Sequence, residues 1–297
     1  MAHFFGLVVL IAIIGVVAYS YGGHLFTRIG PRFGDALSGI QPYSVSVGLR
    51  ERTRVESRPD TVLGVSSTPP VAVDPRDIPE GFSAQDISPH FGKVQLGSVS
   101  AGPSGRISLY ANFKDDESVN ITRWRIQGND GSHYIPQAVN VYDPSGLSSE
   151  SDIFLKNGEF VNLYFTSSAI GKNIRLNKCI GYLQGANQFS PSLPLSCPYI
   201  DRGDIRHLTG TCQNYLLSLG GCRLPAANPP VPFNDYACRA YLDTINYRGC
   251  FDRYSKDSDF LSREWWVWIG STQFLDPSHD RVLLLDRLGL LVDEYSY

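Results

Sequence analysis

The hydrophobic pattern of the chain starts with an uncharged run of eighteen residues that begins at Phe4 and ends at Tyr21. A helix of that length, at about 1.5 Å per residue, measures about 27 Å, close to the thickness of the hydrocarbon core of a bilayer. We therefore predict a transmembrane signal anchor over residues 1–21. A cleavable signal peptide is the alternative, because Ala18 and Ser20 have the small size and spacing that a signal peptidase requires.

Polar residues, prolines and glycines dominate the next part of the chain, residues 22–80. Its second half in particular has no apolar periodicity and is rich in Pro, Ser and charged side chains. That composition is typical of an extended, largely disordered linker. We predict a juxtamembrane segment followed by such a linker, which would hold the folded part away from the membrane.

From residue 81 onward, short runs alternate apolar and polar side chains and are separated by clusters of Gly, Pro, Asn and Asp. This pattern is typical of an antiparallel β-sandwich, and it predicts a mainly β fold, α+β overall. In such a sandwich, we expect Trp124 to be a core residue. The end of the chain predicts a β-hairpin. The expected strands are 93–101, 106–113, 120–128, 160–167 and 263–270, with the hairpin at 280–297.

Two segments between these strands change to the helical period. Residues 204–221 carry apolar side chains at helical spacing and end in two glycines, which is a C-cap signal. Residues 234–249 begin with Asn234 and Asp235, which favour an N-cap, and continue with the same spacing. We predict a small α-helical insertion over residues 169–262 within the sandwich domain 81–297.

All six cysteines lie in that insertion, and none lies in the first 178 residues. An even number of cysteines without a CxxC pair predicts three disulfides in an exported protein. A zinc site needs closer pairs than this sequence has. Free thiols are the other alternative. Six cysteines allow fifteen pairings, so the connectivity is open. The candidates are Cys179, Cys197, Cys212, Cys222, Cys238 and Cys250.

Charge bears on topology and on partners. Five arginines follow the apolar run and no Lys or Arg precedes it, which by the positive-inside rule favours a cytoplasmic C-terminus. The cysteine pattern favours the opposite side, and we give it precedence: a single-pass membrane protein with its C-terminal domain at the cell surface or in the periplasm. The net charge of −3 argues against a nucleic-acid partner, because phosphate binding needs clustered Lys and Arg.

No catalytic motif appears in the sequence: GxSxG, HExxH, the P-loop and the Rossmann glycine pattern are all missing. Neighbouring carboxylates occur at Asp115/Asp116, at Asp201/Asp204 and at Asp257/Asp259. We interpret them as solvated loop charges, with a calcium site at Asp115-Asp116-Glu117 or at Asp252–Asp259 as the alternative. The sequence therefore predicts no catalytic residue, no metal ligand and no cofactor, and no enzymatic activity.

Three stretches stand out: the opening strand KVQLGSVSAG, the run NITRWRIQGNDGSHYIP and the closing hairpin HDRVLLLDRLGLLVDEYSY. Together they resemble the lamin-tail domain. In the second stretch Arg123 stands where the family usually has a glycine before its tryptophan. The resemblance covers residues 93–168 and 265–297. It implies an immunoglobulin-like β-sandwich and, in bacteria, an interaction module of a membrane-associated or exported protein.

These observations predict a membrane-anchored extracytoplasmic interaction protein whose partner is another protein or a surface glycan. Trp265, Trp266 and Trp268, together with the Tyr-rich insertion, are the candidate binding patch. The alternative is that the three indoles fill both faces of a covered sheet. Two other functions stay open: an envelope hydrolase acting on glycan or peptide between insertion and sandwich, and a surface protein that handles DNA.

Overall fold

The computed structural model describes residues 73–114, 117–270 and 274–297. The predicted anchor, the juxtamembrane segment and most of the linker lie outside these ranges and stay predictions. Within the described ranges, no helix has the length and the apolar character needed to cross a bilayer.

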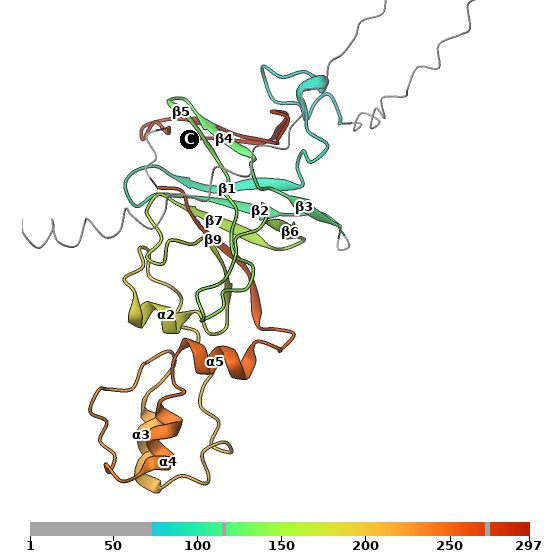
Figure 1. Ribbon diagram of the computed structural model, residues 1–297. Helices are drawn as coiled ribbons and strands as arrows, with labels where there is room; N and C mark the ends of the chain where they lie inside the picture. The colour runs from blue at the N-terminus through green and yellow to red at the C-terminus, as the bar shows by residue number, and fades with distance from the viewer. Residues whose placement is uncertain (1–72, 115–116, 271–273) are drawn as a thin grey trace, which may run out of the picture. The chain divides into compact units, whose positions relative to one another are not determined.

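Strands dominate the described part of the chain, which confirms the prediction of a mainly β protein (Figure 1). A five-stranded sheet has the order β1-β2-β7-β9-β8, and a four-stranded sheet the order β11-β10-β4-β5. The first consists of β1 (Val94–Ser100), β2 (Arg106–Ala111), β7 (Phe160–Tyr164), β9 (Leu261–Trp268) and β8 (Ile174–Asn177). The second consists of β11 (Leu291–Ser296), β10 (Arg281–Leu285), β4 (Arg125–Gly128) and β5 (Gly131–Tyr134), and a small third sheet pairs β3 (Ser118–Asn120) with β6 (Phe154–Lys156).

The first core lies between the five-stranded and the four-stranded sheet. Alternation along β2, β7 and β9 turns one set of apolar side chains inward, as period-two strands require. Ile107, Leu163 and Val267 come from one sheet, and Val282 and Leu284 from the other. Trp124 is almost fully buried in the same core, as the sequence predicted.

One strand pair contradicts the antiparallel expectation. β7 and β9 run parallel, with Phe160 opposite Glu264 and Tyr164 opposite Trp268. Parallel neighbours need a long crossover connection. Here the crossover is the insertion with β8, so the same segment that carries the cysteines also reverses the expected strand direction.

The expected strand 120–128 is wrong as a single element. β3 ends at Asn120 and β4 begins at Arg125, and the two belong to different sheets. Between them Arg123 has a φ of 66°, in the left-handed region, and the Trp124 N–H donates to the Ile121 carbonyl at 3.1 Å. The turn breaks the alternation yet leaves the Trp124 side chain in the core.

The C-terminal hairpin is confirmed. β10 and β11 pair antiparallel, with Arg281 opposite Ser296. Asp286 stabilises the turn, because its Oδ1 accepts from the N–H groups of Leu288 and Leu290 at 2.8 and 3.0 Å. The buried Ser88 hydroxyl donates to Oδ2 of the same carboxylate at 2.7 Å, which fixes the segment before β1 against the hairpin.

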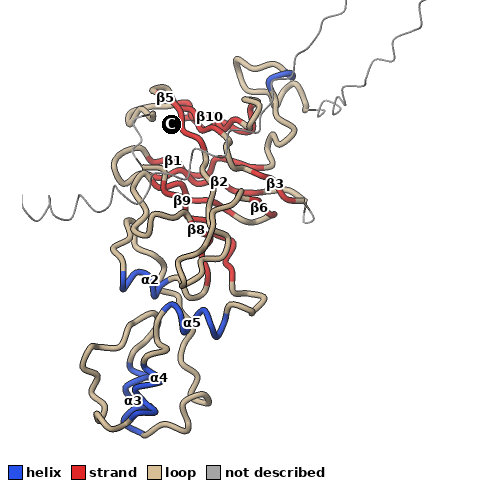
Figure 2. Tube along the Cα trace, viewed as in Figure 1, coloured by secondary structure: helices blue, strands red, loops and turns tan. Residues whose placement is uncertain are grey.

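A second core lies on the other face of the five-stranded sheet, where the insertion covers it. The sheet contributes five large side chains: Tyr164, Ile174, Leu176, Trp266 and Trp268. The insertion contributes residues of its helices and loops, among them Ile180, Leu216 and Leu242. All four α-helices of the described ranges belong to the insertion (Figure 2): α2 (Gly181–Ala186), α3 (Gly210–Ser218), α4 (Tyr236–Leu242) and α5 (Tyr247–Tyr254). The only other helix in the described ranges is the 3₁₀ turn η1 (Ala84–Asp86).

The insertion differs from the expectation in three respects. Its first segment is β8, a strand of the sheet, so it is not purely helical. The expected helix 204–221 begins only at Gly210. The expected helix 234–249 breaks into α4 and α5, because the Asn246 side chain accepts from the Gly249 N–H at 3.0 Å and starts a new helix.

Asp152 joins three separate parts of the sandwich. It accepts hydrogen bonds from Asn120, Gln137 and Arg287 at 2.7, 2.9 and 2.8 Å. These bonds, with Asn120 first, hold the pKa of the Asp152 carboxyl well below its usual range. A carboxylate whose pKa is lowered by folding stabilises the folded state above its unfolded pKa, and the contribution disappears as the pH falls through the folded pKa.

We therefore expect Asp152→Asn to lower the urea midpoint at pH 7 and to have a smaller effect below about pH 4, the unfolded pKa of an aspartate. Urea unfolding of both proteins at pH 7, 4 and 2.5 checks this. Asp130→Asn is the control, because Asp130 is exposed and hydrogen-bonds no side chain in the described ranges. An equal loss for Asp152→Asn at all three pH values would contradict the role of the charge.

Candidate binding cleft on the helical insertion

Three disulfides hold the insertion together, and no cysteine is free. The prediction of disulfides is confirmed, and the structure decides the pairing. Cys179 pairs with Cys250, Cys197 with Cys222, and Cys212 with Cys238. The first bond ties α5 to the end of β8, and the third ties α3 to α4. The insertion is thereby closed on itself and attached to the sheet.

The N-terminal caps of α3 and α4 are hydrogen-bonded to each other. Thr209 Oγ1 accepts from the Cys212 N–H at 3.3 Å, and Asp235 Oδ1 accepts from the Cys238 N–H at 3.0 Å. The Thr209 hydroxyl donates to Asp235 Oδ2 at 2.7 Å, which joins the two caps. Each capped residue is a cysteine of the same disulfide, so the caps and the bond fix the same pair of helix ends.

Tyr247 fixes α5 to the rest of the protein. Its hydroxyl donates to the Tyr142 carbonyl at 2.7 Å and accepts from Asn177 Nδ2 at 3.0 Å. Burial raises the pKa of this phenol well above its ordinary value. α5 is therefore held at its first residue by hydrogen bonds and at Cys250 by a disulfide.

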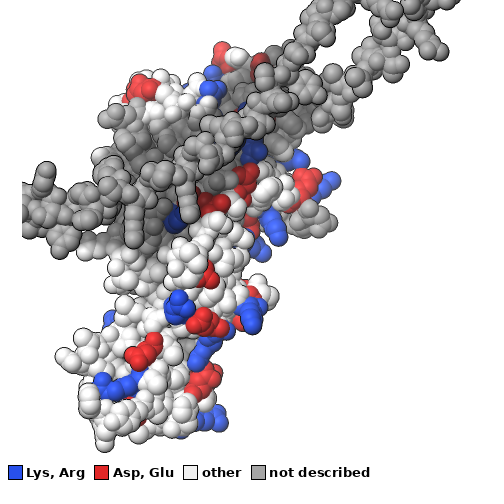
Figure 3. Space-filling view, viewed as in Figure 1, with Lys and Arg blue, Asp and Glu red and all other residues white. Residues whose placement is uncertain are grey.

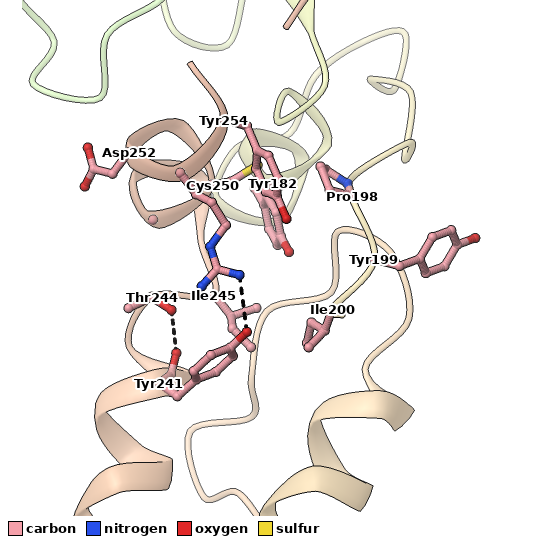
Figure 4. A pocket seen from close by; sticks show the side chains of 12 residues that line it. Tyr182, Pro198, Tyr199, Ile200, Tyr241, Thr244, Ile245, Cys250, Asp252 and Tyr254 are labelled. Atoms are coloured by element: carbon pink, nitrogen blue, oxygen red, sulfur yellow. Dashed lines mark hydrogen bonds between the residues drawn. The ribbon is translucent and has the colours of Figure 1, made fainter. Parts of the chain in front are cut away.

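A cleft of about 360 Å³ opens beside α5, between the segment 198–200 and the end of α4 (Figure 4). That volume lies in the range of small-ligand sites. Four tyrosines line it: Tyr182, Tyr199, Tyr241 and Tyr254. Figure 4 shows Tyr182 and Tyr254 next to each other with their hydroxyls turned into the cleft, whereas Tyr199 points outward. Tyr199 is 82% exposed.

Arg253 is the cationic group of the cleft. Its Nη1 donates to Asp204 Oδ2 at 2.7 Å and to the Tyr241 hydroxyl at 3.5 Å, and the guanidinium lies 5.7 Å from the centre of the Tyr241 ring. Partial burial lowers the pKa of Arg253. Hydrogen bonds with Tyr241 and Tyr254 raise it by more, so the pKa of Arg253 lies above its ordinary value. The side chain is therefore a fixed donor, shared between one carboxylate and the tyrosine cluster.

Tyr182 stays protonated at neutral pH. Burial, and then the nearby phenols of Tyr254 and Tyr241, raise its pKa above the ordinary value. A protonated phenol can donate a hydrogen bond. The cleft therefore presents phenol O–H groups on apolar rings.

A second, smaller hollow of about 70 Å³ adjoins the cleft. The two share Tyr182, the segment 198–200 and Ile245. The smaller hollow continues along α3 to Leu217, which is partly exposed. Together they form one groove across the insertion.

No protein-family model matches this chain, and no curated protein matches its sequence. The chemistry of the cleft is accordingly inferred from its own residues. Its tyrosines come from four separate segments: α2, residues 198–200, α4 and α5. The abundance of tyrosine in the insertion was the only sequence signal for it.

The three tryptophans singled out from the sequence are not a surface patch. Trp265, Trp266 and Trp268 are 3%, 5% and 7% exposed. Trp265 lies in the core between the two sheets, and Trp266 and Trp268 lie in the core under the insertion. Alternation placed them on the correct opposite faces, but the pattern of β9 alone does not reveal what covers each face.

The neighbouring carboxylates of the described chain have partners of their own. Asp201 accepts from the Gly203 N–H, and Asp204 pairs with Arg253. Asp257 and Asp259 share the ammonium of Lys178 at 3.1 and 2.5 Å. In the described ranges, no group of three His, Cys, Asp or Glu side chains has the arrangement of a metal site. Asp115 and Asp116 lie outside them.

Proposed function

We propose that this chain is a membrane-anchored, extracytoplasmic binding protein that presents a lamin-tail-like β-sandwich and uses the insertion for recognition. The observation that carries this proposal is a tyrosine-lined cleft on an insertion that three disulfides hold in place. Disulfides persist in oxidising compartments, which supports an extracytoplasmic domain. The apolar run from Phe4 to Tyr21 supports an anchor, which raises the local concentration of the binding domain at the surface.

Two features of the sandwich support the lamin-tail-like part of the proposal. Two sheets face each other over one core, as in immunoglobulin-like domains. Position 123, where the family usually has glycine, adopts the left-handed conformation that glycine favours, although it is an arginine here. This backbone conformation supports the resemblance despite the different residue.

The charges near the cleft support binding rather than hydrolysis or DNA handling. Glycoside hydrolysis needs two carboxyl groups that flank one bond. Asp204 is paired with Arg253, and Asp252 points away from the tyrosines (Figure 4). Figure 3 shows acidic and basic side chains mixed on the visible face of the insertion, whereas phosphate binding needs clustered basic groups.

The proposal is tested with the full chain in an exporting host. We expect protease added to intact cells or spheroplasts to cleave the domain, and alkylation without reductant to find all six cysteines protected. Vesicles that carry the chain should then retain envelope material, and the double variant Tyr199→Ala, Tyr254→Ala should lose this retention. Tyr134→Ala on β5, at a residue that is 60% exposed, is the control. Free thiols, or retention that the double variant leaves unchanged, would contradict the proposal.

A further inference from the structure

We infer that the cleft binds a proline-rich segment of another protein in the polyproline II conformation. This inference rests on the proposed role of the insertion as the recognition element, and it names the class of ligand. It depends on three features of the cleft: its hydrogen-bond donors, its shortage of acceptors and its aromatic walls.

The donors come from three phenols and one guanidinium. In the described ranges, the hydroxyls of Tyr182, Tyr241 and Tyr254 donate no hydrogen bond to the protein, although those of Tyr241 and Tyr254 accept from Arg253. Other tyrosines of the insertion use their hydroxyls to hold the fold. Tyr247 donates to the Tyr142 carbonyl, and Tyr215 accepts from the Ala226 N–H at 3.0 Å. The donors of the cleft are thus not needed for packing.

Carboxylate and amide acceptors are scarce in the cleft. The side chains that line the cleft include no Asn, Gln, Glu or His. Asp204, which lies next to the cleft, is neutralised by Arg253. Asp252 points away from the tyrosines (Figure 4). The phenol oxygens can still accept, but a ligand that is itself rich in O–H or N–H donors, such as a glycan, would find no free carboxylate or amide oxygen on the side chains that face the tyrosines.

A proline-rich segment has the opposite chemistry. Proline has no backbone N–H, so the segment offers carbonyl acceptors and almost no donors. Its polyproline II helix has no internal hydrogen bonds, which leaves every carbonyl open to a partner. Proteins recognise such segments in grooves lined by aromatic rings, because the helix is preformed and loses little entropy on binding. The rings of Tyr182, Tyr241 and Tyr254 supply such walls.

The prolines of this chain are less suited to the cleft than those of a partner. The loop 225–232 is part of the fold, because Val231 in it is buried in the core under the insertion. Pro69 and Pro70 lie three or four residues before Val73, a span of at most about 14 Å. Val73 packs on Ile87, Leu285 and Leu291, in a cluster separate from the core of the insertion. We therefore assign the occupant to another protein.

The test measures binding of a fluorescein-labelled ten-residue polyproline peptide to the full chain in nanodiscs by fluorescence anisotropy. We expect saturable binding. Tyr182→Phe and Tyr254→Phe keep the rings but remove one donor each, so each should weaken binding about fivefold, as the loss of one neutral hydrogen bond predicts. The double variant should weaken it by about twentyfold. Tyr134→Phe, on β5, should leave binding unchanged.

Four results would overturn the inference. They are absence of saturable peptide binding, equal binding of a Gly/Ser peptide of the same length, tighter binding of a labelled hexasaccharide of N-acetylglucosamine, and binding that both Phe variants leave unchanged. Tighter binding of a peptide with the sequence of residues 64–76 would overturn the assignment to another protein. Vesicle retention that still depends on Tyr199 and Tyr254, without any peptide binding, would reject the ligand class and leave the proposed function intact.

Discussion

Replacing Cys179 and Cys250 together by alanine is expected to destabilise the insertion more than the loss of either of the other two disulfides. This disulfide closes a loop of 71 residues. In the chain-entropy description, a loop of that length lowers the entropy of the unfolded chain by the equivalent of about 4.4 kcal/mol. The bond also ties α5 to the end of β8, and Cys250 lines the cleft. Urea unfolding, followed by hydrogen exchange of the insertion amides, measures the loss.

The other two disulfides provide matched controls. Cys197–Cys222 and Cys212–Cys238 close loops of 25 and 26 residues, for which the same description gives about 3.5 kcal/mol each. The variant Cys197→Ala, Cys222→Ala should therefore be the more stable one by about 1 kcal/mol, and it should keep α5 protected from exchange. If this control lost as much stability as the Cys179/Cys250 variant, loop length would not be the deciding factor.

Trp266→Ala is expected to destabilise the protein by about 3–5 kcal/mol, the usual cost of removing a buried tryptophan. The indole lies between the five-stranded sheet and the insertion, with its ring centre 4.7 Å from that of Tyr164 and 5.9 Å from that of Trp268. Its loss removes part of the surface on which the insertion packs. Hydrogen exchange should therefore become faster first in α2 and α5, before the strands of the first core.

Trp265→Ala is the matched variant, one residue away on the same strand. Its side chain faces the first core, next to Val161 and Val267. A similar total loss is expected, but the faster exchange should appear in β2, β7 and β10 rather than in the insertion. Tyr110→Ala, at a position that is 46% exposed, should change stability much less. The same exchange pattern for both tryptophan variants would contradict the presence of two separate cores.

The sequence by itself determined several features that depend on neighbouring residues. Strand alternation assigned Trp265 and Trp266 to opposite faces, because side chains alternate at every residue of a strand. The closing hairpin could be predicted because its turn residues and both strands are adjacent in the chain. The even number of cysteines, without close pairs, was enough to predict disulfides.

Only the tertiary structure decided what depends on residues far apart in the chain. Local periodicity says which face a side chain occupies but not what covers it, so the burial of Trp266 and Trp268 followed from the insertion. The direction of β9 next to β7, the cysteine pairing and the break at Arg123 depend in the same way on how distant segments meet. The cleft has the same origin: its tyrosines come from four segments, and disulfides and packing bring them together where no local pattern in the sequence does.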